Sequence, residues 1–496
     1  AVPAASSPCR NIYHTWLAIL FLIHTSTEKK MGTATVRLGL INLLNTIIGA
    51  GILAMPYGLK CNGLLFGAAL IVWSSLTSAL GLYLQNKVAK YTQQQGAVSY
   101  FSLCQLTYPQ LLVIFDGAIA IKCFGVGVSY LVVIGDLMPK IVESLGAKEG
   151  LWWLARNLWI SVFMAGVVAP LSFLKKLDLL KYTSVIALVS VVYLICLVVE
   201  HYVADIAPER ALTIVGPVSW RQTLTLFSIF VFAYTCHQNM FAIINELKPS
   251  DKDGSQTRQA NMIIRNAISI ACGSYLVVGV LGYLTFGDSV NANIISMYPR
   301  DSITSLIGRL AIVVMVSLSF PLQCHPCRGS LNHVLHFVRH GVSLGKLRKS
   351  NNANGYSQLT DGTESDSADQ SFDQSFISTT PMEGAQDTEG HAPIVVPLSS
   401  TKFYAITSLI VVAAYLVAMT VTSLAHVLAF VGATGSTSIS FILPGVFSYM
   451  LIRPLDGGEM TTLEKFCKYG GLVLAIWGVL VMVVCLSASI FLGATH

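Results

Sequence analysis

The sequence predicts an all-α, polytopic membrane protein with about eleven transmembrane helices, and three observations lead to this fold class. Of the 496 residues, 54% are hydrophobic and only 11% are charged, whereas soluble domains carry about 25% charged residues. The mean hydropathy is +0.65. The apolar residues come in blocks near the ~20-residue length that a helix needs to cross a bilayer, rather than in amphipathic stripes. This composition excludes a soluble enzyme.

The apolar blocks define eleven predicted spans. Their approximate ranges are 37–58, 63–84, 111–135, 157–174, 182–203, 221–246, 261–285, 303–325, 402–422, 426–450 and 469–492.

Polar segments divide the chain into four predicted regions. Residues 1–30 form an ill-defined N-terminal extension, for which a signal peptide and an extra span are alternatives. Residues 31–340 hold helices 1–8, and residues 401–496 hold helices 9–11. Between them, residues 341–400 form an acidic linker, with eight Asp or Glu and no Lys or Arg within 351–390. Such a polar segment is predicted to be disordered. It is either a tether or a binding segment for cytosolic regulators.

The distribution of Lys and Arg indicates the orientation. With the N-terminus in the cytosol, 22 of the 31 basic residues fall on the cytosolic side and eight on the far side, and Lys122 falls within a span. Because basic residues are enriched on the cytosolic side of membrane proteins, we expect a cytosolic N-terminus and a C-terminus on the far side.

Two spans contain residues that interrupt a transmembrane helix. The first span, "LGLINLLNTIIGAGILAMPYGL", carries the triplet Gly49-Ala50-Gly51. Its glycines weaken the helix and let the backbone approach a ligand; close helix packing is the alternative. The sixth span contains "FAYTCHQN" (232–239), a run of polar residues. Buried polar groups without partners cost several kcal/mol each in hydrocarbon. We therefore expect this run to line a cavity that a polar substrate enters.

The two interruptions are five spans apart, which is the spacing that two inverted five-helix repeats predict. In such proteins, the amino termini of the half-helices face a substrate carboxylate, and the carboxyl ends receive cations. Because an α-amino acid carries both groups, the pattern favours an amino acid substrate.

Several longer motifs carry a family resemblance. The stretches "LNTIIGAGILAMPYG", "AIKCFGVGVSYLVVIGD", "FVFAYTCHQNMFAIINEL", "GYLTFG" and "VGATGSTSISFILPG" resemble the amino acid/auxin permease family. Within it, they are similar to the fungal vacuolar amino acid transporters of the Avt type, in the exporter branch. The resemblance implies a LeuT-like core with broken helices 1 and 6, proton coupling and export to the cytosol. It also implies a vacuolar membrane, with a luminal C-terminus.

The resemblance also implies the site residues. The substrate cradle in the first helix would comprise Thr46, Ile47, Ile48, Gly49 and Gly51, and the opposite wall would comprise Tyr234, Thr235 and His237. In sodium-coupled relatives, the positions of Asn45 and Ser317 help form a cation site. A serine stands here where those relatives often have threonine, which favours protons as the coupling ion.

Two cationic side chains have alternative interpretations. Lys122 lies well inside the third span, where a lysine costs about 2.5–3.5 kcal/mol. It either pairs with Asp116 or Asp136, or faces the cavity and meets a substrate carboxylate. His237, with an ordinary pKa near 6.5, is either a hydrogen-bonded structural residue or a sensor of an acidic lumen. If Lys122 or protonated His237 faces the cavity, acidic amino acids are among the expected substrates.

The remaining motifs do not indicate a metal site or an enzyme. The segment "QCHPC" (323–327) offers Cys324, His325 and Cys327, but no second compact pair completes a zinc site. The Ser/Thr run "GATGSTSIS" (432–440) either satisfies backbone carbonyls or lines a gate. No paired carboxylates, nucleophile motif or phosphate loop indicates an enzyme. No cofactor, metal or nucleic-acid partner is expected, and the expected partners are an amino acid, protons and the lipid bilayer. An amino acid sensor with little net flux is the alternative function.

Overall fold

The structure, a computed structural model, describes most of the chain outside its N-terminal region and the acidic linker. The described residues are 35–91, 98, 100–108, 111–146, 152–174, 183–204, 211–248, 256–340, 398–454 and 459–491. The predictions for residues 1–30 and for 341–397 lie outside these ranges. The helix that follows the linker begins at Ser400, so the last residue assigned to the linker is already helical.

The helices follow one another in the order that the sequence predicts. The first five spans are α2 (Val36–Ile47) with η1 (Ala50–Ala54) and α3 (Met55–Asn62); α4 (Leu64–Ala89); α6 (Leu111–Ser144); α7 (Arg156–Phe163) with η4 (Met164–Val168) and α8 (Ala169–Ser172); and α9 (Thr183–Ala204). The next six are α10 (Trp220–Ala233) with η6 (His237–Asn239) and α11 (Met240–Glu246); α12 (Thr257–Phe286); α13 (Ile303–His340); α15 (Ser400–Thr420); α16 (Leu424–Val431) with η10 (Gly432–Ser436), η11 (Ser438–Ile442) and α17 (Leu443–Leu451); and α18 (Thr462–Phe491).

The predicted fold class is confirmed. Nine helices in the described ranges are long and apolar enough to cross a membrane, and the pair Val36–Ile47 and Ala50–Asn62, bent by 47°, forms a tenth span. The shorter apolar helix Arg156–Ser172 coincides with the fourth predicted range, 157–174, and accounts for the one remaining span. The described ranges contain no strand. Spans 1 and 6 are the two that unwind in the middle, as the LeuT-like plan of two five-helix repeats requires.

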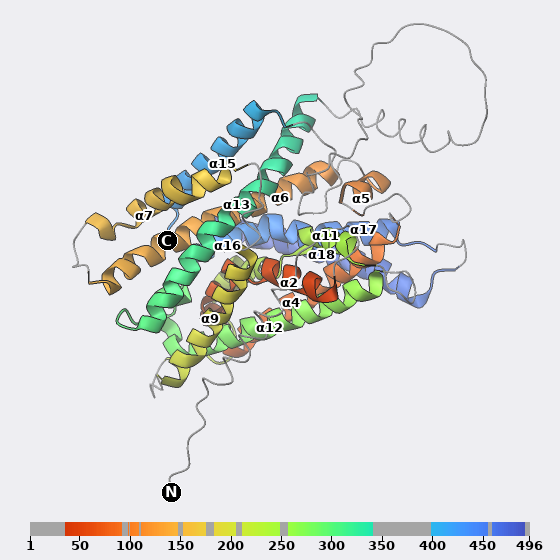
Figure 1. Cartoon of the computed structure of the whole chain (residues 1–496). Coiled ribbons are helices and arrows are strands. Elements are labelled where there is room, and N and C mark those ends of the chain that lie inside the picture. The colour runs from red at the N-terminus through yellow and green to blue at the C-terminus, as the bar shows by residue number, and fades with distance from the viewer. Residues whose placement is uncertain are drawn as a thin grey trace.

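The spans form two packed groups. In one group, α12 packs along α4 and along both halves of span 1. In the other group, α13 packs along α6, and α7 and α15 cover α6 and each other. Figure 1 shows α7 and α15 side by side at one edge of the bundle, and α12 with α4 and α2 towards the opposite edge. The breaks in spans 1 and 6 therefore face α6 and span 10 across the middle of the bundle.

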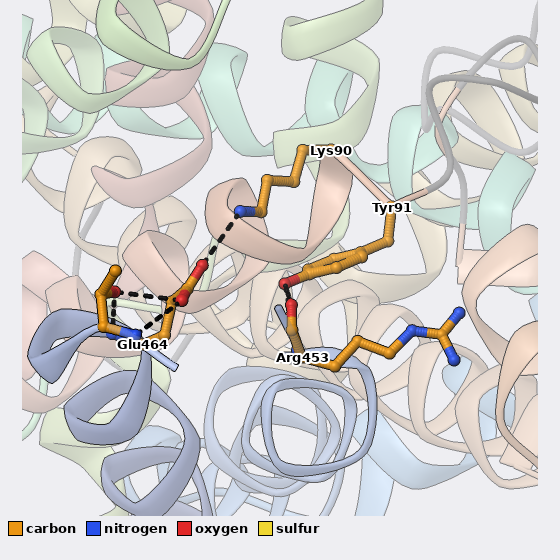
Figure 2. A network of polar contacts seen from close by, with 5 residues as sticks. Lys90, Tyr91, Arg453 and Glu464 are labelled. Carbon is orange, nitrogen blue, oxygen red and sulfur yellow. Dashed lines mark hydrogen bonds and ion pairs between the residues drawn. The ribbon is translucent and has the colours of Figure 1, made fainter. Parts of the chain in front are cut away.

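A polar network ties two distant parts of the chain together at one end of the bundle (Figure 2). Lys90, which follows α4, lies 3.7 Å from the Oε1 atom of Glu464 at the start of α18. The hydroxyl of the adjacent Tyr91 donates to the carbonyl of Arg453, at 3.0 Å, in the segment between α17 and α18. Both segments follow an even-numbered span, so an alternating topology places them on the same side of the membrane.

Span 10 is wound more widely than an α-helix in its middle. Its segments η10 and η11 are both π-helical, a rare form that often occurs at functional sites. Neighbouring spans approach it closely at glycines: a Cβ atom at Gly432 would stand 2.0 Å from the Ser228 carbonyl oxygen, and one at Gly435 would stand 2.6 Å from the Ala118 carbonyl oxygen. The "GATGSTSIS" run is therefore a packed wall between α10 and α6.

The segment between α12 and α13 covers the break of span 1 from the end where α6 stops. Its short helix η8 (Ile294–Ser296) contacts η1. Lys140 of α6 donates to the carbonyl of Ser296 at 2.7 Å. The fully buried Arg309 donates to the carbonyls of Ile295, at 3.4 Å, and Tyr298. These contacts close the bundle on that side.

Candidate functional site

The break in span 1 leaves three consecutive backbone amides without an acceptor. The helix α2 ends at Ile47, and the chain resumes as η1 at Ala50. The Ile52 amide donates to the Gly49 carbonyl at 3.2 Å. In contrast, no described residue accepts a hydrogen bond from the amides of residues 49–51. These are the orphan donors of a helix amino terminus, where an anionic group is stabilised.

The break in span 6 has the same construction. The helix α10 ends at Ala233, and the amides of Tyr234 and Thr235 both donate back to the Phe232 carbonyl. No acceptor within the described ranges lies opposite the next three amides, residues 236–238. The side chains of these three residues are at most 2% exposed. Because buried amides without partners cost about 1–3 kcal/mol each, the two breaks together demand a polar ligand or ordered water.

The glycines of span 1 serve two different purposes. A Cβ atom built on Gly49 meets no atom within 4 Å, whereas one on Gly51 would stand 3.1 Å from both the Cα and the Cβ atoms of Ala233. Gly51 therefore lets the two broken spans approach each other, which is the packing role that the sequence left as an alternative. Gly49 borders open space, as expected for a residue against which a substrate lies.

Side chains near the breaks connect spans 1, 6 and 10. Asn239 donates through Nδ2 to the Oγ1 atom of Thr46 at 2.8 Å, and Thr46 donates to the Asn42 carbonyl at 3.0 Å. Thr235 donates to the carbonyl of Val231 at 2.9 Å. Ser440 of η11 donates to Thr235 at 3.3 Å. These bonds join span 6 to span 1 through Asn239 and Thr46, and to span 10 through Thr235 and Ser440.

The unwound segment of span 6 is anchored to α4 and to the short helix α5 (Tyr100–Leu106). Ser78 of α4 donates to the Tyr234 carbonyl at 3.0 Å, and its own carbonyl lies 3.2 Å from His237 Nε2. Tyr100 donates to the His237 carbonyl at 2.9 Å. Sequence reasoning missed Ser78 and Tyr100, because nothing in their own segments distinguishes them from other buried hydroxyl residues.

His237 has one engaged ring nitrogen and one without a partner. The ring is fully buried. Since a carbonyl can only accept, Nε2 carries the hydrogen that reaches Ser78, and Nδ1 then holds a lone pair. The Nδ1 atom has no hydrogen-bond partner in the described structure. His237 therefore anchors the break through Nε2, and its Nδ1 atom keeps a lone pair.

Lys122 is buried without a carboxylate partner. Its exposed fraction is 5%, and it forms no hydrogen bond or ion pair with any described residue. Both carboxylates that could have neutralised it are taken: Asp116 lies 3.3 Å from Nδ1 of His333, and Asp136 lies 3.7 Å from Nε of Arg156. Lys122 is close enough to Cys236, within the break of span 6, for an electrostatic interaction. The sequence could not exclude these two pairings, and the structure does.

Asn45 and Ser317, the positions of the cation site in sodium-coupled relatives, do not contact each other directly here. Asn45 donates through Nδ2 to Ser184 at 3.1 Å, and its Oδ1 atom is buried without a partner. Ser317 donates to the carbonyl of Val313 at 2.7 Å. The antiparallel register of α9 and α13, fixed by a bond from Ser190 to the Ala311 carbonyl, brings Ser184 level with Ser317.

The cysteines, the possible metal site and the surface cavity give no second candidate site within the described ranges. The ten cysteines in the described ranges form no disulfide bond with one another. Within those ranges, no group of three or more His, Cys, Asp or Glu side chains could hold a metal ion. A cavity of about 250 Å³ is lined by residues such as Thr225, His426 and Phe430, and none of them belongs to either break.

Tyr275, in the middle of α12, is a further residue that sequence reasoning missed. Its hydroxyl lies 2.8 Å from the carbonyl oxygens of both Ile47 and Ala233, the last residues of the two half-helices. A tyrosine within an apolar span was the only sequence feature that pointed to Tyr275. Tyr283 in the same helix has the same feature, so the sequence does not distinguish the two.

Two helix breaks whose amides lack acceptors in the described part of the chain, with open space at Gly49, suit a membrane transporter of a small polar solute. The chain matches the family of transmembrane amino acid transporter proteins over residues 32–484. It belongs to that family, and the resemblance that its motifs carry is confirmed.

Two relatives in Saccharomyces cerevisiae align with nearly the whole chain. Vacuolar amino acid transporter 6 is 45% identical over 471 residues, which cover 93% of this chain and 100% of that protein. Vacuolar amino acid transporter 5 is 41% identical over 482 residues, which cover 93% and 99%. Among solved structures, the crystal structure of MhsT in complex with L-phenylalanine aligns with 92% of this chain and 100% of that one. Its TM-score is 0.44 at 10% identity.

Proposed function

We propose that this protein is a secondary active transporter that moves amino acids across the vacuolar membrane. The observation that carries the proposal is the pair of breaks, each of which presents three backbone amides without an acceptor among the described residues. A substrate carboxylate satisfies such donors, and the half-helix amino termini favour its charge. The names of the two yeast relatives, both vacuolar amino acid transporters, support the substrate class and the membrane.

Lys122 supports acidic amino acids as substrates. A buried ammonium without a carboxylate partner is costly, and a side-chain carboxylate of glutamate or aspartate would neutralise it. Since Lys122 interacts electrostatically with Cys236 in the break, its charge acts on the same place as the free amides of span 6. We assign the substrate side chain to this end of the site and its α-carboxylate to the amides of span 1.

Protons are the proposed coupling ion. His237 Nδ1 has a free lone pair at the break, and Ser317 directs its hydroxyl to its own helix. Each pH unit across the membrane supplies about 1.4 kcal/mol per proton, which suffices for a tenfold amino acid gradient. An acidic vacuolar lumen therefore drives export to the cytosol.

The test uses the full-length protein in proteoliposomes with labelled glutamate and glutamine. Imposing an acidic interior should accelerate efflux, and collapsing the pH difference should abolish the acceleration, with no effect of replacing sodium by choline. Efflux that requires sodium and ignores the pH difference would contradict proton coupling. Saturable binding without steady flux would favour the amino acid sensor instead.

A further inference from the structure

One hydroxyl group serves both breaks. Tyr275 of α12 is 0% exposed, and its Oη atom lies 2.8 Å from the Ile47 carbonyl oxygen and 2.8 Å from the Ala233 carbonyl oxygen. The ring of Tyr234 packs edge-on against the Tyr275 ring, with 5.1 Å between centroids. The hydroxyl is therefore held at the point where the carboxyl ends of α2 and α10 converge.

These two carbonyls have lost the donors that a continuous helix would supply. In an α-helix, a carbonyl accepts from the amide four residues later. For Ile47 that amide belongs to Gly51, and for Ala233 it belongs to His237. Both amides are among those without an acceptor at the breaks. The Tyr275 hydroxyl therefore offers one shared donor where two amide donors are missing, one in each span.

A phenol has a single hydrogen to give to these two oxygens. The carbonyl ends of half-helices carry partial negative charge, and in transporters of this architecture such ends receive cations. Here a fixed O–H dipole is shared between the two ends, so the position of one carbonyl affects the bond to the other. Tyr275 thus connects the geometry of span 1 with that of span 6.

We propose that Tyr275 is the positioning residue that holds both breaks open, because its hydroxyl replaces the Gly51 and His237 amides and leaves them for the substrate. This inference deepens the proposed function, since its ligand is the amino acid assigned there. Removing the hydroxyl leaves two buried carbonyls without a donor, which loosens both breaks together and misaligns the amides that meet the carboxylate.

The matched pair of variants is Tyr275→Phe and Tyr283→Phe. Tyr283 lies in the same helix and is also 0% exposed, and its hydroxyl bonds the Thr213 amide at 2.8 Å and Asp288 at 2.9 Å, outside both breaks. Each substitution keeps the ring and removes one buried hydroxyl. Tyr283→Phe therefore removes a buried, hydrogen-bonded hydroxyl as Tyr275→Phe does, but at a position away from the breaks.

The first measurement is hydrogen–deuterium exchange of the purified full-length protein without substrate. Tyr275→Phe should raise exchange about tenfold in the peptides that cover residues 45–54 and those that cover 232–240, and Tyr283→Phe should change neither. A rise in only one break, in neither, or equally in the control would overturn the proposal. This measurement does not depend on which solute the protein carries.

The second measurement is transport in proteoliposomes, with the labelled proteinogenic amino acid that the wild-type protein carries fastest. Tyr275→Phe should raise KM about tenfold, equivalent to about 1.4 kcal/mol, and Tyr283→Phe should leave KM unchanged. A wild-type KM in Tyr275→Phe would overturn the positioning role while the transport function stands. A wild-type protein that carries no amino acid would refute the proposed function, and the exchange experiment would still decide the role of Tyr275.

Discussion

Substitution of the two glycines in span 1 separates a substrate-facing role from a packing role. An alanine at Gly51 would place its Cβ atom 3.1 Å from the Cα and Cβ atoms of Ala233, so the two broken spans must move apart by a few tenths of an ångström. Such overpacking costs about 1–3 kcal/mol. An alanine at Gly49 meets no atom within 4 Å, and the φ of −133° suits an L-residue. We expect a stability change within about 0.5 kcal/mol there.

The corresponding assays are thermal unfolding of the purified protein and the KM for a labelled amino acid. Gly51→Ala should lower the unfolding temperature, whereas Gly49→Ala should leave it unchanged and raise KM about tenfold by filling the substrate space. Gly49→Val and Gly51→Val should both abolish transport while the protein remains inserted in the membrane. An unfolding temperature that falls in Gly49→Ala, or a Gly49→Ala protein with wild-type KM, would refute the assignment of open space to the substrate.

Three further predictions follow from the site and the topology. Lys122→Met should reduce glutamate flux about a hundredfold and spare glutamine, because a desolvated carboxylate loses its cationic partner; equal loss of both fluxes would instead assign the lysine to coupling or structure. His237→Gln should flatten the dependence of transport on luminal pH, measured as initial rates in isolated vacuoles, and an unchanged dependence would remove His237 from the proton path. A protease site fused to the C-terminus should resist cytosolic protease in sealed vacuoles, and cleavage there would contradict the predicted luminal C-terminus.

The sequence predicted those features that a local pattern encodes. Apolar blocks of about twenty residues located the spans, and the Gly49-Ala50-Gly51 triplet and the polar run at 232–239 located both breaks. In each case the residues that determine the backbone conformation are adjacent in the chain, so their spacing is sufficient evidence. The helix carrying the first break is bent by 47° at this triplet.

Features that depend on contacts between spans could not be predicted. The sequence left Asp116 and Asp136 as alternative partners of Lys122, because only the packing of α6 against α13 and α7 brings His333 and Arg156 to those carboxylates. Likewise, Tyr275 and Tyr283 look alike in sequence. Their different roles arise from which carbonyls or amides the neighbouring spans place beside each hydroxyl.

The π-helical turns of span 10 differ from α-helical turns in the number of residues that each turn holds. A π-turn holds one residue more than an α-turn, so converting η10 to α-helix would displace the residues beyond it by one position in the winding. One position corresponds to about 100° of rotation and about 1.5 Å of rise. The face that Ser440 presents to Thr235 would then turn away, while the close contact of Gly432 with Ser228 stays fixed behind it. A one-residue change in the winding of span 10 would therefore turn its polar face relative to the contact between Gly432 and Ser228.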